Sequence, residues 1–254
     1  MNISSLPTST KKRIIGYTAV VFILLLCRIV VGQVNWSGSP NLHVVMDLLA
    51  ASLAFFVGTL AVVRFYTKQN SAYLFIGIGF IGAGVLDAVH ALHTVSLFNL
   101  ITSGDNLLET WHWNPSPTFL SILMVGSWLI WQRSKQKEIP SKKLYLILAA
   151  VSFISIIIFV LIPQPPINDS LNLSGRVTAV FTATFFLLAL IGYLHKGEWQ
   201  HDAFEHWLVV ALIINVLAQG LFTFFFFIPF NSLFDTAIIL KKVCNHTVFI
   251  GIIH

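Results

Sequence analysis

SAYLFIGIGFIGAGVLDAVHALHTV, at residues 71–95, is the stretch of sequence that decides the fold. It carries no charged residue before Asp87, and it exceeds the roughly 20 apolar residues that a helix needs to cross the hydrocarbon core of a bilayer. It does not show the alternation of apolar and polar residues that is typical of strands in membrane barrels. Because a backbone in lipid must satisfy its hydrogen bonds within the segment, the stretch predicts a transmembrane α-helix.

Other apolar runs of similar length precede and follow this stretch. Together they predict an all-α, polytopic bundle of about eight transmembrane helices, at about residues 13–32, 42–64, 71–95, 115–133, 143–163, 174–195, 205–229 and 233–254. No low-complexity linker separates the runs, so residues 1–254 are expected to form a single membrane domain. The last run stays apolar to its end, which predicts that a cytoplasmic output module follows it in a longer protein.

Composition also indicates a membrane protein. The chain is 56% hydrophobic and 10% charged, with a mean hydropathy of +0.83, which is outside the range of ordinary soluble domains. Its 15 Lys and Arg residues outnumber the 10 Asp and Glu residues, but they lie between the apolar runs rather than in one patch. This placement is typical of membrane topology, so the expected surrounding is membrane lipid and no nucleic-acid partner is expected.

The basic residues predict the orientation of the chain. If the runs alternate in direction, the connections on the side of the amino terminus carry many basic residues, whereas those on the other side carry only Arg176. By the positive-inside rule, both termini are expected in the cytoplasm. The basic residues on the inner side are Lys11, Lys12, Arg13, Arg64, Lys68, Arg133, Lys135, Lys137, Lys142, Lys143 and Lys196.

Ionisable side chains inside the predicted spans are the candidates for a functional site. Such groups cost several kcal/mol in a bilayer unless they are paired or hydrated, and they are therefore rare without a function. With the predicted orientation, the candidates lie in the outer parts of four helices. The predicted ligand-binding set consists of Arg28, His43, Asp47, Asp87, His90, His93 and Lys241.

Helical spacing groups four of these candidates into two pairs. His43 and Asp47 are four residues apart, and Asp87 and His90 are three apart, so each pair shares one helix face. One interpretation is an outward-facing polar pocket in which the aspartates oppose Arg or Lys side chains and the histidines bind a ligand, proton or metal. The alternative is a buried network of ion pairs and hydrogen bonds that fixes helix packing.

The histidines also allow a metal or haem site. His90 and His93 have a spacing at which two imidazoles can share a metal ion, and His43 completes the predicted metal set. Haem held by two histidines of facing helices is a further alternative, with His246 among the candidates. No phosphate loop, HExxH or kinase motif occurs in the sequence, so no catalytic residue is assigned and the segment is not predicted to be an enzyme.

Three stretches resemble the bacterial membrane-associated sensor domains of the MASE group, most closely the third type. They are HVVMD at 43–47, LFIGIGFIGAGVLDAVH at 74–90, and Leu240-Lys241 in the last run. The resemblance implies a transmembrane input domain at the amino terminus of a histidine kinase or diguanylate cyclase, with a stimulus that the sequence does not name. It also implies a multi-pass location in the bacterial inner membrane and two-component or cyclic di-GMP signalling. A homodimer is implied as well, because such outputs act in pairs.

Two other functions stay open at this point. One is a metal- or haem-binding membrane protein that uses the histidines. The other is a small-solute transporter, although the chain shows neither an internal repeat nor the paired broken helices that are typical of transporters.

Overall fold

The computed structural model describes residues 7–34, 36, 38–94, 115–134, 146, 149–150, 153–154, 157, 173–224 and 232–253. This part of the chain is helical and contains no strand, which confirms the predicted all-α fold. The helix bounds lie close to the predicted ones. The helices are α1 (Thr8–Val31), α2 (Pro40–Lys68), α3 (Ser71–Thr94), α5 (Pro115–Ser134), α7 (Leu173–Lys196), α8 (Ala203–Leu217) and α9 (Ser232–Ile253), with the short 3-10 helix η3 (Glu198–Gln200) and the π-helix η4 (Ala218–Thr223).

Six helical segments of the described chain are long and apolar enough to cross a bilayer. They are Thr8–Val31, Asn41–Lys68, Ser71–Leu92, Gly175–Lys196, Ala203–Thr223 and Ser232–Ile253. α5 is not among the six, and the predicted run at 143–163 lies almost entirely outside the described residues. The protein is therefore a helical membrane protein with several candidate spans, and the count of eight stays a prediction.

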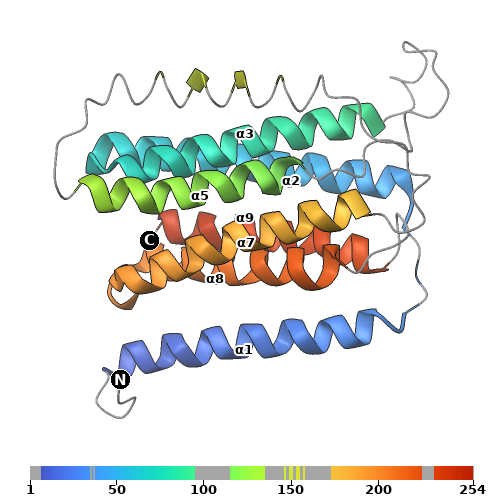
Figure 1. The fold of residues 1–254 in the computed structure, drawn as a ribbon, viewed down its shortest axis with the longest axis horizontal. Coiled ribbons are helices and arrows are strands. Elements are labelled where there is room, and N and C mark those ends of the chain that lie inside the picture. The colour runs from blue at the N-terminus through green and yellow to red at the C-terminus, as the bar shows by residue number, and fades with distance from the viewer. Residues whose placement is uncertain are drawn as a thin grey trace.

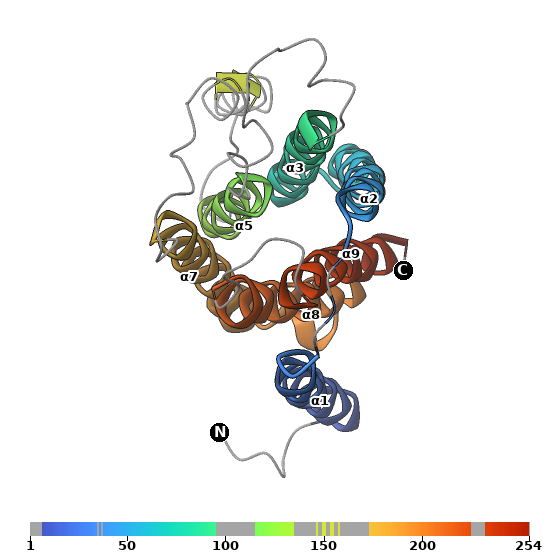
Figure 2. The same cartoon turned by 90° about the vertical axis from the view of Figure 1, so that its right-hand side faces the viewer.

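Six helices form a closed ring when the bundle is viewed from its end (Figure 2). Each contacts the next in the order α2, α3, α5, α7, α8 and α9, and α9 returns to contact α2. α1 lies outside this ring, against α8 and α9 (Figure 2). The start of α1 and the end of α9 lie at the same end of the bundle, on the left in Figure 1. The opposite end, where α2 and α9 begin, is called the distal end below.

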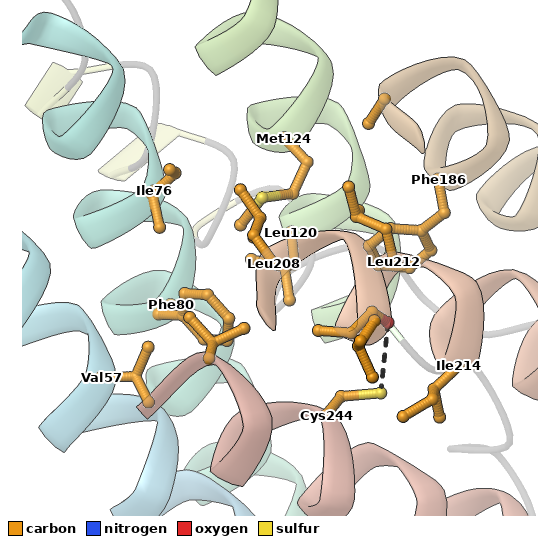
Figure 3. Packing of buried hydrophobic residues seen from close by; sticks show 14 of the residues in the cluster. Val57, Ile76, Phe80, Leu120, Met124, Phe186, Leu208, Leu212, Ile214 and Cys244 are labelled. Carbon is orange, nitrogen blue, oxygen red and sulfur yellow. Dashed lines mark hydrogen bonds between the residues drawn. The ribbon is translucent and has the colours of Figure 1, made fainter. Parts of the chain in front are cut away.

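Buried apolar side chains fill the inside of the ring. Phe80 of α3, Leu120 of α5 and Leu208 of α8 point toward one another in Figure 3, and Val57 and Phe186 reach in from α2 and α7. Large apolar side chains also cover the outer faces of the helices, for example Ile15 at 67% exposed and Phe56 at 64%. In a soluble protein such a surface would drive association, so it is consistent with contact to lipid.

A tight hairpin joins α2 to α3. α2 begins where Ser39 Oγ accepts a hydrogen bond from the backbone N–H of Leu42 at 3.2 Å. α2 ends before Gln69, which adopts the left-handed conformation with φ of 52°, and Asn70 then accepts from the backbone N–H of Ala72 at 3.0 Å. Because the two helices are antiparallel, the start of α2 lies beside the end of α3.

Glycines bring α2 and α3 into close contact along this hairpin. A Cβ atom at Gly58 would lie 2.8 Å from the backbone oxygen of Gly77, and one at Gly77 would lie 3.0 Å from the backbone oxygen of Gly58. Helices that pack through small residues approach more closely than others, and this is common in membranes. Close packing of the hairpin keeps the polar side chains at its distal end within hydrogen-bonding distance of one another.

Candidate functional site

His43, Asp47 and His90 meet at the distal end of α2 and α3, and they are called the histidine triad. Nε2 of His43 lies 3.1 Å from Oδ2 of Asp47 and 3.2 Å from Nε2 of His90. Nε2 of His90 lies 3.6 Å from the same oxygen of Asp47. The helical spacing places His43 above Asp47 on α2, and the hairpin delivers His90 from α3. Three potential ligand atoms therefore converge on one point.

Asp87, Ser116 and Lys241 form a second group, called the lysine triad, which joins α3, α5 and α9. Oδ1 of Asp87 accepts hydrogen bonds from Nζ of Lys241 and from Oγ of Ser116. Nζ of Lys241 also donates to Oγ of Ser116 at 2.6 Å. Asp87 stands one turn before His90 on α3, so the two triads are neighbours on the same helix face.

Both triads are shielded from solvent. Asp47 and Asp87 are each 4% exposed, whereas the side chains of His90 and Lys241 are 18% and 15% exposed. A buried charge is strongly destabilising without a partner, and both carboxylates have basic groups beside them. The partly exposed His90 and Lys241 are the members of the triads that lie nearest to the surface.

α9 contributes further residues around the two triads. The ring of Phe234 packs against that of His43, with the centroids 5.1 Å apart and the planes inclined by 34°. Asp235 is 2% exposed, and Lys242 interacts electrostatically with it and with the aspartates of both triads. Lower on the same helix, Nδ2 of Asn245 donates to the backbone oxygen of Ala50 at 3.1 Å. α9 is thereby joined to α2 as well as to α3 and α5.

The structure brings together five of the seven residues in the predicted ligand-binding set, namely His43, Asp47, Asp87, His90 and Lys241. Arg28 has a different contact. It lies in the last turn of α1, and its Nε donates to the backbone oxygen of Leu221 at 2.9 Å. Leu221 belongs to the π-helix η4. His93 falls within α3, but its side chain lies outside the described part of the chain, so the predicted metal set is described only for His43 and His90.

Ser116, Phe234 and Asp235 contribute to the site and were not among the predicted residues. Ser116 lies between Pro115 and Pro117, and prolines are favoured in the first turn of a helix, so the start of α5 was readable from the sequence. Nothing in the sequence indicated that its hydroxyl faces Asp87. Phe234 had no signal either, because aromatic residues are frequent throughout the apolar runs.

A family model described as a membrane-associated sensor domain, MASE3, matches residues 34–236. The chain belongs to this family. No curated protein and no solved structure matches the chain. Membership confirms the resemblance seen in the sequence, and it supports a membrane location and a sensory input role for this segment.

The MASE3 match covers most of the site. It includes the histidine triad, Asp87 and Ser116, whereas Lys241 lies after its last residue. The match begins just before α2 and ends within the first turns of α9. The α2–α3 hairpin and its polar distal end thus belong to the part that the chain shares with the family.

Proposed function

We propose that this MASE3 domain receives its stimulus at the distal end, in an outward-facing polar pocket formed by the two triads. The signal then passes through α9 to a cytoplasmic output module. The observation that carries the proposal is the Asp87–Lys241 ion pair, because it ties α9 to α3 beside the histidine triad. A sensor needs one site that can change its charge and one element that responds to the change. The histidine triad and α9 fill these two roles.

The coupling between the triads is electrostatic. A cation, proton or polar ligand at the histidine triad changes the charge next to Asp87, and charges shielded from water interact more strongly than exposed ones. The strength of the contacts among Asp87, Ser116 and Lys241 changes in turn. Because Lys241 belongs to α9, the position of α9 in the ring changes with it. The packing of Phe234 on His43 gives a second contact through which α9 follows the triad.

The output module is proposed to be a histidine kinase or a diguanylate cyclase. It would place the domain in a two-component system or in cyclic di-GMP signalling. Because both kinds of output act in pairs, the protein is proposed to work as a homodimer. Family membership supports the input role from which these proposals start.

Both termini are proposed to lie in the cytoplasm, with eight spans in the inner membrane. α5 is one of the added spans, since it has 20 residues and runs alongside its neighbours in Figure 1. The run at 143–163 is the other. An even number of spans agrees with the shared end of α1 and α9 in Figure 1. We expect reporter fusions at residue 1 and after residue 254 to report the cytoplasm; activity of a periplasmic reporter at the carboxyl end would contradict the topology.

Substitution of Asp87 by Asn and of His90 by Gln tests the sensing site in the full-length protein. Each change is expected to shift basal output activity by about tenfold or more, which corresponds to about 1.4 kcal/mol in the balance between two states. Thermal unfolding in detergent is measured alongside. If Asp87→Asn fails to fold, the double variant Asp87→Asn with Lys241→Met is used in its place, because it removes both charges of the ion pair.

His246→Gln is the matched control. His246 is exposed and lies on α9 one turn beyond Lys242, so its replacement should leave folding and output unchanged. The sensing role is rejected if the Asp87 and His90 variants fold like the wild type and their output and response stay at the wild-type level.

A further inference from the structure

We infer that the histidine triad binds a divalent transition-metal ion, with Zn²⁺ as the best match. The ligands are Nε2 of His43, Oδ2 of Asp47 and Nε2 of His90. Imidazole and carboxylate groups in this ratio hold zinc in many protein sites, where a fourth position stays open for water or another ligand. The inference rests on the proposed function, because it names the chemical class of the ligand at the same site.

The distances between the three ligand atoms carry the inference. Zinc bonds of about 2.0–2.1 Å in a tetrahedron require ligand atoms about 3.3–3.4 Å apart. The three separations in the histidine triad are 3.1, 3.2 and 3.6 Å. The triad is thus already arranged as one face of a coordination tetrahedron, and little movement of α2 against α3 is needed to bind an ion.

A hydrogen-bonded arrangement satisfies these atoms less well. Oδ2 of Asp47 can accept from an Nε2–H of each histidine, but the two donors then face each other across only 3.2 Å. A metal ion accepts one lone pair from each of the three ligand atoms. This requires that neither Nε2 carries a proton and that the carboxylate is ionised. Convergence of three atoms, rather than pairing of two, therefore favours a cation at the centre.

The charges around the triad also favour a cation. In the described part of the distal end, three buried carboxylates, those of Asp47, Asp87 and Asp235, face the ammonium groups of Lys241 and Lys242. The ionised carboxylate of Asp47 is costly inside a membrane domain unless positive charge lies beside it. A divalent ion bound between its Oδ2 and the two imidazoles supplies such a charge.

The position of the histidine triad gives an ion access from the surface of the distal end. His43 lies in the first turn of α2, close to the surface of the distal end, and the side chain of His90 is 18% exposed. Three protein ligands leave a fourth position open for water or another ligand. The structure therefore assigns to this MASE3 domain a metal site with an open position, reached from the distal end.

Metal analysis of the purified full-length protein tests the inference directly. After incubation with ZnCl₂ and removal of the excess, we expect the wild type to retain about one zinc ion per chain, as for a single three-ligand site. With Co²⁺ in place of Zn²⁺, visible absorption bands of a tetrahedral ion should appear. His43→Ala, Asp47→Asn and His90→Ala should each weaken binding by more than about a hundredfold, since even residues behind the ligands change metal affinity about 10- to 100-fold.

His246→Ala serves as the control, because it removes an exposed histidine from α9 and should leave zinc binding unchanged. The metal assignment is overturned if the wild type retains no zinc, or if the control loses as much as the ligand variants. Should a ligand variant fail to fold, the Co²⁺ spectrum of the wild type still decides the question. A wild type without zinc whose Asp87→Asn variant still shifts output refutes the metal and leaves the sensing site intact, so the two proposals fail separately.

Discussion

Replacing Lys241 with Met is expected to lower the free energy of unfolding by about 3–5 kcal/mol, the usual cost of removing one partner of a buried ion pair. Asp87 is 4% exposed, and in the variant its carboxylate keeps only Ser116 as a hydrogen-bond partner within the lysine triad. The loss comes mainly from removing the ammonium group that pairs directly with this buried carboxylate. Unfolding of the purified protein in detergent, followed by circular dichroism against increasing denaturant, measures the change.

The double variant Asp87→Asn with Lys241→Met distinguishes the cost of an unpaired buried charge from the contribution of the ion pair itself. It carries no charge at either position, so most of the stability lost in Lys241→Met should return. Lys68→Met is the matched control, because Lys68 is exposed in the last turn of α2 and should change stability by less than about 0.5 kcal/mol. Equal unfolding curves for Lys241→Met and Lys68→Met would show that the ion pair contributes nothing to stability.

A second large effect is expected at the opposite end of the bundle, for Lys196→Met. Lys196 Nζ pairs with Glu205 of α8, and the two side chains are only 2% and 6% exposed. The ammonium also lies 4.5 Å from the centre of the Trp131 ring. The variant leaves the Glu205 carboxylate buried without its cation. We expect it to lose about 3–5 kcal/mol of unfolding free energy, measured in the same detergent assay.

Lys196 supplies its own control, because it also pairs with Glu198 at 2.8 Å. The Glu198 side chain is 49% exposed, and exposed ion pairs contribute only about 0–1 kcal/mol. Glu198→Gln should therefore change stability by no more than this amount. A loss in Glu198→Gln as large as that in Lys196→Met would mean that burial does not decide the energy of this cluster.

The sequence predicted the helices well because each apolar run is bounded by charges, glycines or prolines. α3 was predicted at 71–95 and runs from Ser71 to Thr94, and α5 was predicted at 115–133 and runs from Pro115 to Ser134. The run predicted at 205–229 corresponds to the candidate span Ala203–Thr223, and its last part lies outside the described residues. α8 changes to a π-helix at Ala218, and a π-helix has no hydrophobic pattern that distinguishes it from an α-helix.

The candidate site was predictable where one helix sets the spacing and less so where helices meet. His43 with Asp47, and Asp87 with His90, followed from helical periodicity. Arg28 was expected to face the aspartates, but its Nε donates to the backbone oxygen of Leu221 in the π-helix η4. The partners of a long side chain depend on which helices become neighbours, and a single sequence does not encode this in a readable pattern.

The Asp87–Lys241 ion pair, which joins α3 to α9, also has a consequence for how the protein is made. Asp87 and Lys241 are 154 positions apart, and at about 5–20 residues per second the ribosome needs roughly 8–30 s to synthesise that stretch. During this interval Asp87 is already in the nascent chain and its lysine is not. Until α9 is inserted, the Asp87 carboxylate lacks the lysine that pairs with it in the folded protein. This ion pair therefore forms only after the helices that precede α9 have been synthesised.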